Sequence, residues 1–303
     1  MKNGILIAGA VAIVVVGAAL VLRNSGAEAP APEQQAAGPV AHMSSGPVPD
    51  FSSDKLGWRQ NNRGGDNTGF NPIPGDDSTR LILHHPDFPY AQNVVNRVGD
   101  FTSPLLTPWA AKILEERARK VMAGGIPFIP NSRCWPGGVP GLHFFPAPIY
   151  FLQTEKEVWL LSNRGEVRRI FMDQAHSADP GYSWYGESVG WYENGNTLVV
   201  DTIGQDDKGP IDRYNIPHTK QIHVVERFTM NADRTEMNVI ITVEDPGAFT
   251  QPLKGLMRYT PATERGATEK TEWEEYVCNE NSEEFFIPAD QLVPVPSATK
   301  RDF

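Results

Sequence analysis

The sequence predicts a mainly β fold, built as an antiparallel barrel, with a β-sandwich as the alternative. From Ile149 onward, short segments alternate apolar and polar residues, which is typical of strands. Tight turns separate these segments, and one of them contains Asn194-Gly195, a strong hairpin signal. No helical segment fits between the strands, so crossover connections and parallel pairing are not expected. The predicted strands are 149–154, 157–162, 166–173, 187–193, 197–203, 221–230, 236–245 and 271–278.

The N-terminus carries an unbroken apolar run from Gly4 to Leu22. As a helix it would span roughly 28 Å, about the hydrocarbon thickness of a bilayer. Lys2 precedes the run and favours a cytoplasmic N-terminus. We therefore predict that residues 1–23 anchor the chain in the cytoplasmic membrane, through residues 4–22, with the folded domain in the periplasm or outside. The alternative is a cleaved signal peptide and a secreted protein, because Ala27-Glu28-Ala29 resembles a cleavage site.

Three further regions follow this segment. Residues 24–50 are rich in Ala and Pro and lack apolar periodicity, which predicts a linker. Residues 51–148 predict an irregular arm that contains a helix over 108–122, with Thr107 as its N-cap and Pro108 in its first turn. Residues 149–303 form the predicted β domain.

Charge and motifs exclude several classes of function. Lys and Arg total 27 and Asp and Glu total 37, a net charge of −10, which argues against nucleic-acid binding. No phosphate-binding loop, dinucleotide motif, EF-hand loop or haem-attachment motif occurs, so no cofactor is predicted. The seven histidines do not follow a metal-specific spacing, so no metal site is predicted either.

A carboxylate lies on an apolar strand face in segment 221–230. Glu226 alternates with apolar residues there, and Arg169 shares a face with Val167 and Phe171. A charge inside a barrel is costly unless it is paired, so we expect Glu226 and Arg169 to meet in the interior. The pair could serve acid/base chemistry, with shifted pKa values, or could be a structural ion pair that fixes the strand register.

Other candidate site residues lie near the predicted strand ends. His176 and His218 could meet over the barrel mouth and transfer protons. Trp184 and Tyr185 belong to an aromatic cluster that either packs in the core or stacks on a ligand. Ser188 occurs in a Gly-x-Ser-x-Gly pattern, but a strand follows it, so it is not expected to be a nucleophile. Ser188 and His223 are retained as ligand-contacting candidates.

The chain contains two cysteines, Cys134 and Cys278. In the predicted topology both lie outside the membrane, where a disulfide between them would be stable. The alternative is two separate buried thiols.

Several motifs resemble those of a large family of exported, functionally uncharacterised bacterial proteins. They are Trp-Tyr-Gly-Glu-Ser-Val-Gly at 184–190, Thr-Leu-Val-Val-Asp-Thr at 197–202 and His-Val-Val-Glu-Arg-Phe at 223–228. The resemblance covers residues 105–281 and implies export and a shared domain plan, without a catalytic assignment. The sequence departs from the family pattern before His176 and at Asn279.

Together these features predict an extracytoplasmic barrel that binds a small apolar or aromatic molecule. If it is an enzyme, we expect cofactor-free acid/base chemistry, as in a lyase, isomerase or hydrolase. Glu226 would be the acid or base, Arg169 its electrostatic partner, and His176 or His218 the proton shuttle. The alternative is a non-catalytic envelope protein in which these charges act as struts. Under this alternative the protein would dock a partner, which the sequence does not identify.

Overall fold

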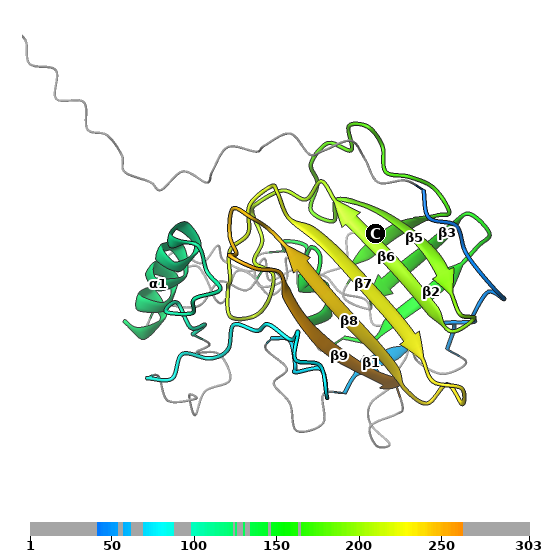
Figure 1. Cartoon of the computed structure of the whole chain (residues 1–303), viewed down its shortest axis with the longest axis horizontal. Coiled ribbons are helices and arrows are strands. Elements are labelled where there is room, and N and C mark those ends of the chain that lie inside the picture. The colour runs from blue at the N-terminus through cyan, green and yellow to red at the C-terminus, as the bar shows by residue number, and fades with distance from the viewer. Residues whose placement is uncertain are drawn as a thin grey trace, which may run out of the picture.

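The structure is a computed structural model that describes residues 41–53, 57–61, 69–87, 98–123, 125, 130, 134–144, 147–162 and 165–262. Strands β1 to β9 close into a barrel in sequence order, which confirms the mainly β fold class and the barrel (Figure 1). Helix α1 and the short helix η2 accompany it. The strands are β1 Trp58–Gln60, β2 Ile149–Gln153, β3 Glu157–Ser162, β4 Val167–Met172, β5 Glu187–Glu193, β6 Thr197–Ile203, β7 His223–Met230, β8 Met237–Glu244 and β9 Leu253–Pro261.

One strand pair corrects the antiparallel prediction. β4 and β5 are parallel, with Ile170 opposite Ser188 and Met172 opposite Gly190. The connection 173–186 leads the chain from the end of β4 back to the end of the barrel at which β4 begins. It contains bends and an isolated bridge, without a helix. The prediction assumed that a helix must connect two parallel strands, but here a long irregular loop connects them.

Strands β1 and β9 were not predicted. β9 pairs with β8 over seven positions and with β1 over three, so it closes the barrel. The sequence of β9 does not indicate a strand, because Gly255 interrupts the alternation of apolar and polar residues. A Cβ atom at Gly255 would lie 2.3 Å from Phe70 Cβ, so glycine is what allows the arm to pack on this strand. The predicted strand 271–278 lies outside the described residues.

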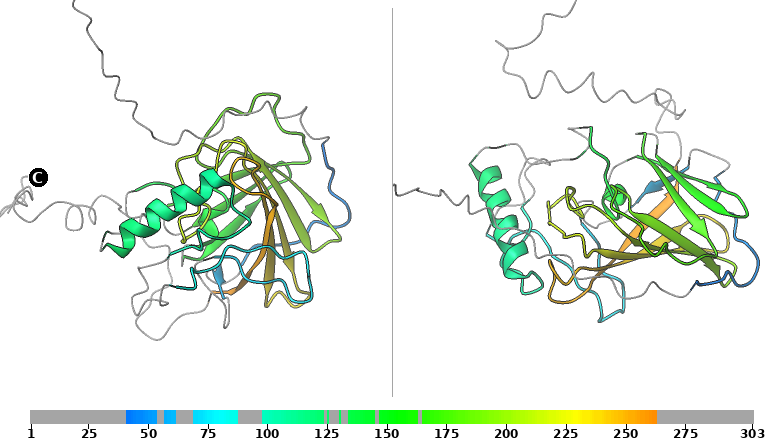
Figure 2. Two further views of the ribbon diagram at one scale, coloured as in Figure 1. Left: turned by 60° about the vertical axis from the view of Figure 1, so that its left-hand side comes forward. Right: turned by 90° about the horizontal axis from the view of Figure 1, so that it is seen from above.

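Helix α1, Pro108–Met122, has the predicted bounds and cap. The Ala110 N–H donates to Thr107 Oγ1 at 3.3 Å, and Thr107 Oγ1 donates to the Gly247 carbonyl at 2.9 Å. The second bond joins the start of the helix to the loop between β8 and β9. α1 therefore lies beside the barrel, as the two views of Figure 2 show. Its buried residues are Ala110, Leu114, Ala118 and Val121.

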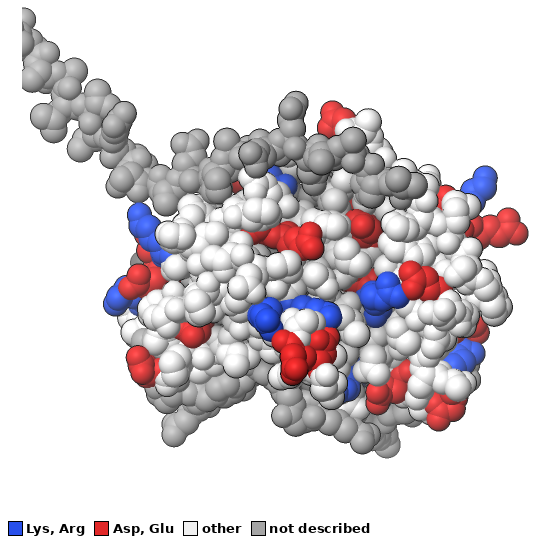
Figure 3. Space-filling view, viewed as in Figure 1, with Lys and Arg blue, Asp and Glu red and all other residues white. Residues whose placement is uncertain are grey.

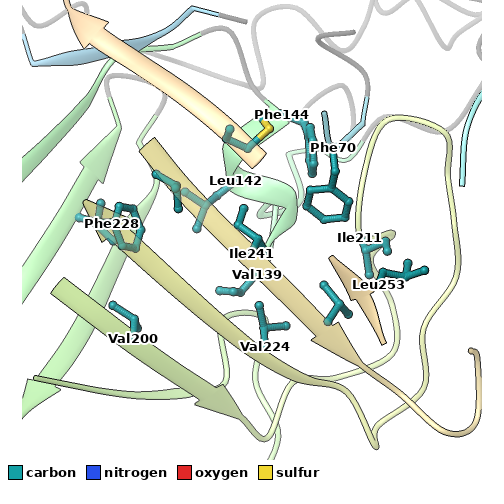
Figure 4. Close-up of a cluster of buried hydrophobic side chains, with 14 of the residues drawn as sticks. Phe70, Val139, Leu142, Phe144, Val200, Ile211, Val224, Phe228, Ile241 and Leu253 are labelled. Carbon is teal, nitrogen blue, oxygen red and sulfur yellow. The ribbon is translucent and has the colours of Figure 1, made fainter. Parts of the chain in front are cut away.

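Helix η2, Gly141–Phe144, is buried along its whole length. Figure 4 shows Val139, Leu142 and Phe144 lying among side chains from the barrel strands. These residues belong to the same apolar cluster as Val200, Val224, Phe228 and Ile241. The segment 134–144 thus supplies part of the barrel core and brings His143 into it.

The end of the predicted linker lies on the barrel. Ser44 donates to Asp173 Oδ1 through both its backbone N–H and its hydroxyl, at 2.6 Å each. The Ser45 N–H donates to the Tyr192 carbonyl at 2.8 Å, and the Phe51 N–H donates to Gln153 Oε1 at 2.7 Å. Residues 41–53 therefore form a strap along the barrel wall (Figure 1).

The predicted anchor, residues 1–23, lies outside the described residues. Within the described part of the chain, no helix combines the length and the apolar character that a membrane span requires. On the face drawn in Figure 3, acidic and basic side chains are interspersed.

Candidate functional site

A chain of polar side chains crosses the barrel interior around Glu226. Glu226 is fully buried, and its Oε2 accepts a hydrogen bond from Arg168 Nη2 at 2.5 Å. Its Oε1 lies 2.5 Å from His143 Nε2, and His143 Nδ1 lies 2.6 Å from the Tyr259 hydroxyl. These four residues, called the interior network below, come from β7, β4, η2 and β9. The inward orientation of Glu226 is therefore as predicted.

The partner of Glu226 is Arg168, which corrects the predicted pairing with Arg169. The Arg168 side chain is 2% exposed, whereas that of Arg169 is 48% exposed and bonds to Glu157 on the outer face. The Arg169 guanidinium also lies over the Phe171 ring, 4.4 Å from its centroid. In the sequence Val-Arg-Arg-Ile-Phe-Met, each face carries one arginine and two apolar residues. The alternation therefore could not say which arginine points inward.

The environment of Glu226 favours its ionised form. Burial acts to raise the pKa of its carboxyl, but the charge of Arg168 and the hydrogen bond with His143 outweigh burial and lower the pKa to about 2. The pKa of Tyr259 moves the other way, because burial and the nearby Glu226 charge both raise it. The network thus holds an ion pair next to a phenol that keeps its proton.

Arg168 makes two further hydrogen bonds, to side chains on the β5 and β6 strands. Its Nε donates to Ser188 Oγ at 3.1 Å, and its Nη2 donates to Thr202 Oγ1 at 2.8 Å. The Ser188 and Thr202 hydroxyls are 2.9 Å apart. Arg168 Nη1, in contrast, is buried and has no hydrogen-bond partner among the described residues. Ser188, a predicted ligand-contacting residue, therefore lies in the interior as an orienting group for Arg168.

A second buried carboxyl group, Glu166, lies just before β4. It accepts hydrogen bonds from the Gly137 N–H at 3.0 Å and from the Tyr185 hydroxyl. Burial raises the pKa of Glu166, and these two hydrogen bonds only partly oppose that effect. Burial and the Glu166 charge raise the pKa of Tyr185, while the charge of Arg168 lowers it, so Tyr185 lies within electrostatic range of Arg168.

The predicted aromatic pair, Trp184 and Tyr185, lies where segment 134–144 meets the loops at the ends of β5 and β6. The Trp184 ring is 5.1 Å from the Trp135 ring, centroid to centroid, and Lys208 Nζ lies 5.3 Å from the Trp184 centroid. Trp184 and Tyr185 are both partly exposed. An aromatic surface therefore adjoins the buried Glu166 carboxyl group, which Tyr185 contacts.

His176 and His223 meet on the outer face of the barrel. His176 Nε2 and His223 Nε2 lie 3.0 Å and 2.9 Å from the same oxygen, Asp201 Oδ1. His176 Nδ1 also lies 3.1 Å from Glu187 Oε1. The hydrogen bond with Asp201 raises the pKa of His223, although burial opposes it. These contacts join the 173–186 loop to β5, β6 and β7, away from the interior network.

The expected meeting of His176 and His218 is not observed. His218 Nδ1 lies 3.0 Å from the Thr219 carbonyl, and Thr219 in turn donates to Asp245. Burial lowers the pKa of His218. His176 lies within the connection 173–186 between the parallel strands β4 and β5, and the sequence did not reveal this pairing. His176 instead shares Asp201 with His223.

Sequence reasoning missed His143, Glu166, Arg168, Thr202 and Tyr259. A charged residue on an apolar strand indicates an interior ion pair, but Arg168 and Arg169 both fit this description. His143 lies in a Pro-rich stretch without periodicity, and Tyr259 lies in a strand that was not predicted.

The remaining predictions concern the disulfide and metal binding. Cys278 lies outside the described residues, so its pairing with Cys134 stays a prediction. Among the residues that the structure describes, no group of three or more His, Cys, Asp and Glu side chains could hold a metal ion.

Comparison of the chain with protein-family models, with curated proteins and with solved structures found no match. The resemblance to exported bacterial proteins therefore stays a prediction, and the functional argument depends on the site itself.

Proposed function

We propose that the barrel binds a small molecule with an apolar or aromatic part, and that Arg168 is the polar group that receives it. The observation that carries the proposal is Arg168 Nη1, a buried donor that has no hydrogen-bond partner among the described residues. A buried donor left in this state costs about 1–3 kcal/mol. A native protein that retains such a group needs a reason for it, and a role in binding or catalysis is one.

The position of this donor is fixed before any ligand binds. The Arg168 guanidinium is planar, and its hydrogen bonds to Ser188, Thr202 and Glu226 set its orientation. The Nη1 hydrogens consequently point in a defined direction. A donor that is already oriented in a site of low dielectric binds an acceptor without paying for rearrangement.

The other groups divide into positioning and reacting roles. Both Glu226 oxygens are occupied, so Glu226 is a positioning residue that fixes Arg168 and His143. Glu166 has a raised pKa and lies beside Tyr185, which is in electrostatic range of Arg168. Two carboxyl groups whose pKa values move in opposite directions are typical of an acid and a permanent anion. In an acid/base reaction of the lyase, isomerase or hydrolase type, Glu166 would be the acid.

Trp184 would hold the apolar part of the molecule. Trp184 is partly exposed, and its ring lies against that of Trp135. It is next in the chain to Tyr185, which bonds to Glu166. An aromatic surface next to a few convergent polar groups is the usual composition of a small-molecule site.

The second candidate function is a non-catalytic envelope protein in which the interior charges only stabilise the barrel. The complete burial of Glu226 and the engagement of both its oxygens favour it. Under this alternative, no small molecule would contact Arg168.

The substitution Arg168→Lys tests the proposal, with acetophenone as the probe. Lysine keeps a positive charge near Glu226 but lacks the Nη1 donor. We expect acetophenone affinity, measured by the shift of the Trp184 indole signal in NMR, to fall about tenfold. The matched control is Arg169→Lys, one residue away on the outer face, which should leave affinity unchanged.

A double variant guards against loss of folding. Arg168→Met with Glu226→Met removes both charges together, so that no ion is left buried without a partner. It should unfold cooperatively and fail to bind acetophenone. If the wild-type protein does not bind the probe, or if both variants bind it as well as the wild type does, the structural alternative is the correct one.

The location outside the cytoplasm belongs to the same proposal. The apolar run at 4–22 supports an anchor or export signal, and the strap at 41–53 holds a later part of the chain on the barrel wall. Cell fractionation followed by N-terminal sequencing of the mature protein distinguishes the anchor from the cleaved signal.

A further inference from the structure

We propose that the bound molecule presents a neutral carbonyl oxygen, held jointly by Arg168 Nη1 and Gln205 Nε2. This inference depends on the proposed function, because it names the chemical class of the molecule that Arg168 receives. It adds Gln205 as a residue that determines specificity.

The orientation of the Gln205 amide follows from one contact. Gln205 Oε1 accepts a hydrogen bond from the Val139 N–H at 2.9 Å. The reverse orientation would place the amide NH₂ against another N–H donor, so the oxygen must face Val139. Nε2 therefore points elsewhere. It is buried, and it has no hydrogen-bond partner in the described part of the chain.

The side chains of Arg168 and Gln205 contact the same short segment, the start of β5 and the turn before it. A Cβ atom at Gly186 would lie 2.9 Å from Gln205 Cγ, and Ser188, two residues later, bonds to Arg168 Nε. On the neighbouring strand, Thr202 bonds to Arg168 Nη2 and Gln205 follows three residues later. Arg168 and Gln205 thus belong to one end of the interior, and each brings one buried donor atom without a described partner.

The charges around these donors select a neutral acceptor. The Arg168 cation is already balanced by Glu226, and the Gln205 amide has no charge. A ligand carboxylate would place a further anion near Glu226, with no unpaired cation to compensate it. A carbonyl oxygen accepts two hydrogen bonds without adding charge. We therefore infer a ketone, ester or lactone.

Three probes of similar shape test the inference. Acetophenone carries a carbonyl group, ethylbenzene lacks the oxygen, and benzoate carries a charge. We expect the wild-type protein to bind acetophenone at least about tenfold more tightly than either of the others, by the Trp184 indole shift. Gln205→Met should lower acetophenone affinity about tenfold and leave ethylbenzene affinity unchanged.

The control variant is Gln153→Met, which changes a glutamine that bonds to the strap and to Tyr192. It should leave the affinity for all three probes unchanged. If Gln205→Met does not fold, Gln205→Glu replaces it, since a glutamate still offers an acceptor to the Val139 N–H but no donor. The same loss of acetophenone affinity is expected.

The outcomes separate this inference from the proposed function. Equal binding of acetophenone and ethylbenzene, with no effect of the Gln205 variants, overturns the carbonyl assignment and leaves the small-molecule site standing. Tighter binding of benzoate also overturns it. If none of the three probes binds, the proposed function fails as well.

Discussion

Glu226→Gln should lower the free energy of unfolding by about 3–5 kcal/mol, the range for breaking a buried ion pair. The substitution preserves the shape of the side chain but removes its charge. Arg168, with a side chain that is only 2% exposed, would then be a buried cation without a counter-ion. His143 would also lose the carboxylate that lies 2.5 Å from its Nε2. Urea denaturation followed by tryptophan fluorescence measures the change.

Glu157→Gln is the matched control for this variant. Glu157 pairs with Arg169 on the outer face, one strand residue away from Arg168, and Arg169 is 48% exposed. An exposed ion pair contributes at most about 1 kcal/mol. Similar losses for the two variants would mean that the interior pair is not the stabilising element described above.

The dependence on pH supplies a second readout of the same pair. The pKa of Glu226 falls from 4.5 to about 2 on folding, so its ionised form stabilises the native state. That stabilisation is complete above pH 4.5 and is lost as the pH falls from 4.5 through 2. The Gln variant should lose less stability across this interval than the wild type does. Parallel stability curves for the two proteins would contradict the assignment.

Gly186→Ala should lower the free energy of unfolding by more than about 3 kcal/mol, because a clash adds to backbone strain. Gly186 has φ +65°, and a Cβ atom there would lie 2.2 Å from the Ile203 carbonyl oxygen. That oxygen is part of the backbone at the end of β6 and cannot move without disturbing the strand. The variant should also weaken acetophenone binding, because Gly186 separates Tyr185 from Ser188. Urea denaturation and the Trp184 indole shift measure the two effects.

Gly181→Ala separates the two contributions. Gly181 lies in the same loop and also has φ +65°, but nothing lies within 4 Å of the position that a Cβ atom would take. It should lose only the backbone term, about 1–2 kcal/mol. Equal losses at both positions would mean that the close approach to Ile203 has no energetic consequence.

Much of the barrel could be predicted because most strands bury one face and expose the other. β7 and β8 alternate regularly, so their approximate positions and the inward orientation of Glu226 followed from the sequence. β9 was not predicted because Gly255 breaks its alternation. This glycine is needed for the contact with Phe70, which lies far away in the chain. The parallel pairing of β4 and β5 was not predicted either, because the irregular loop that connects them has no periodic sequence pattern.

The site was only partly predictable, for equally specific reasons. Arg168 and Arg169 are adjacent and flanked alike, so only the register of the folded strand identifies the inner one. His143 reaches Glu226 from a short helix that lies between β1 and β2 in the chain, and Tyr259 reaches His143 from β9. These contacts join segments separated by more than 80 residues, as for His143 and Glu226, and no local pattern encodes them.

A crystal structure of the protein soaked with acetophenone tests the central claim most directly. The account predicts the carbonyl oxygen at about 3 Å from both Arg168 Nη1 and Gln205 Nε2, the usual distance for such hydrogen bonds, with the ring on the side of Trp184. Acetophenone bound elsewhere, with Nη1 bonded to ordered water alone, would contradict it.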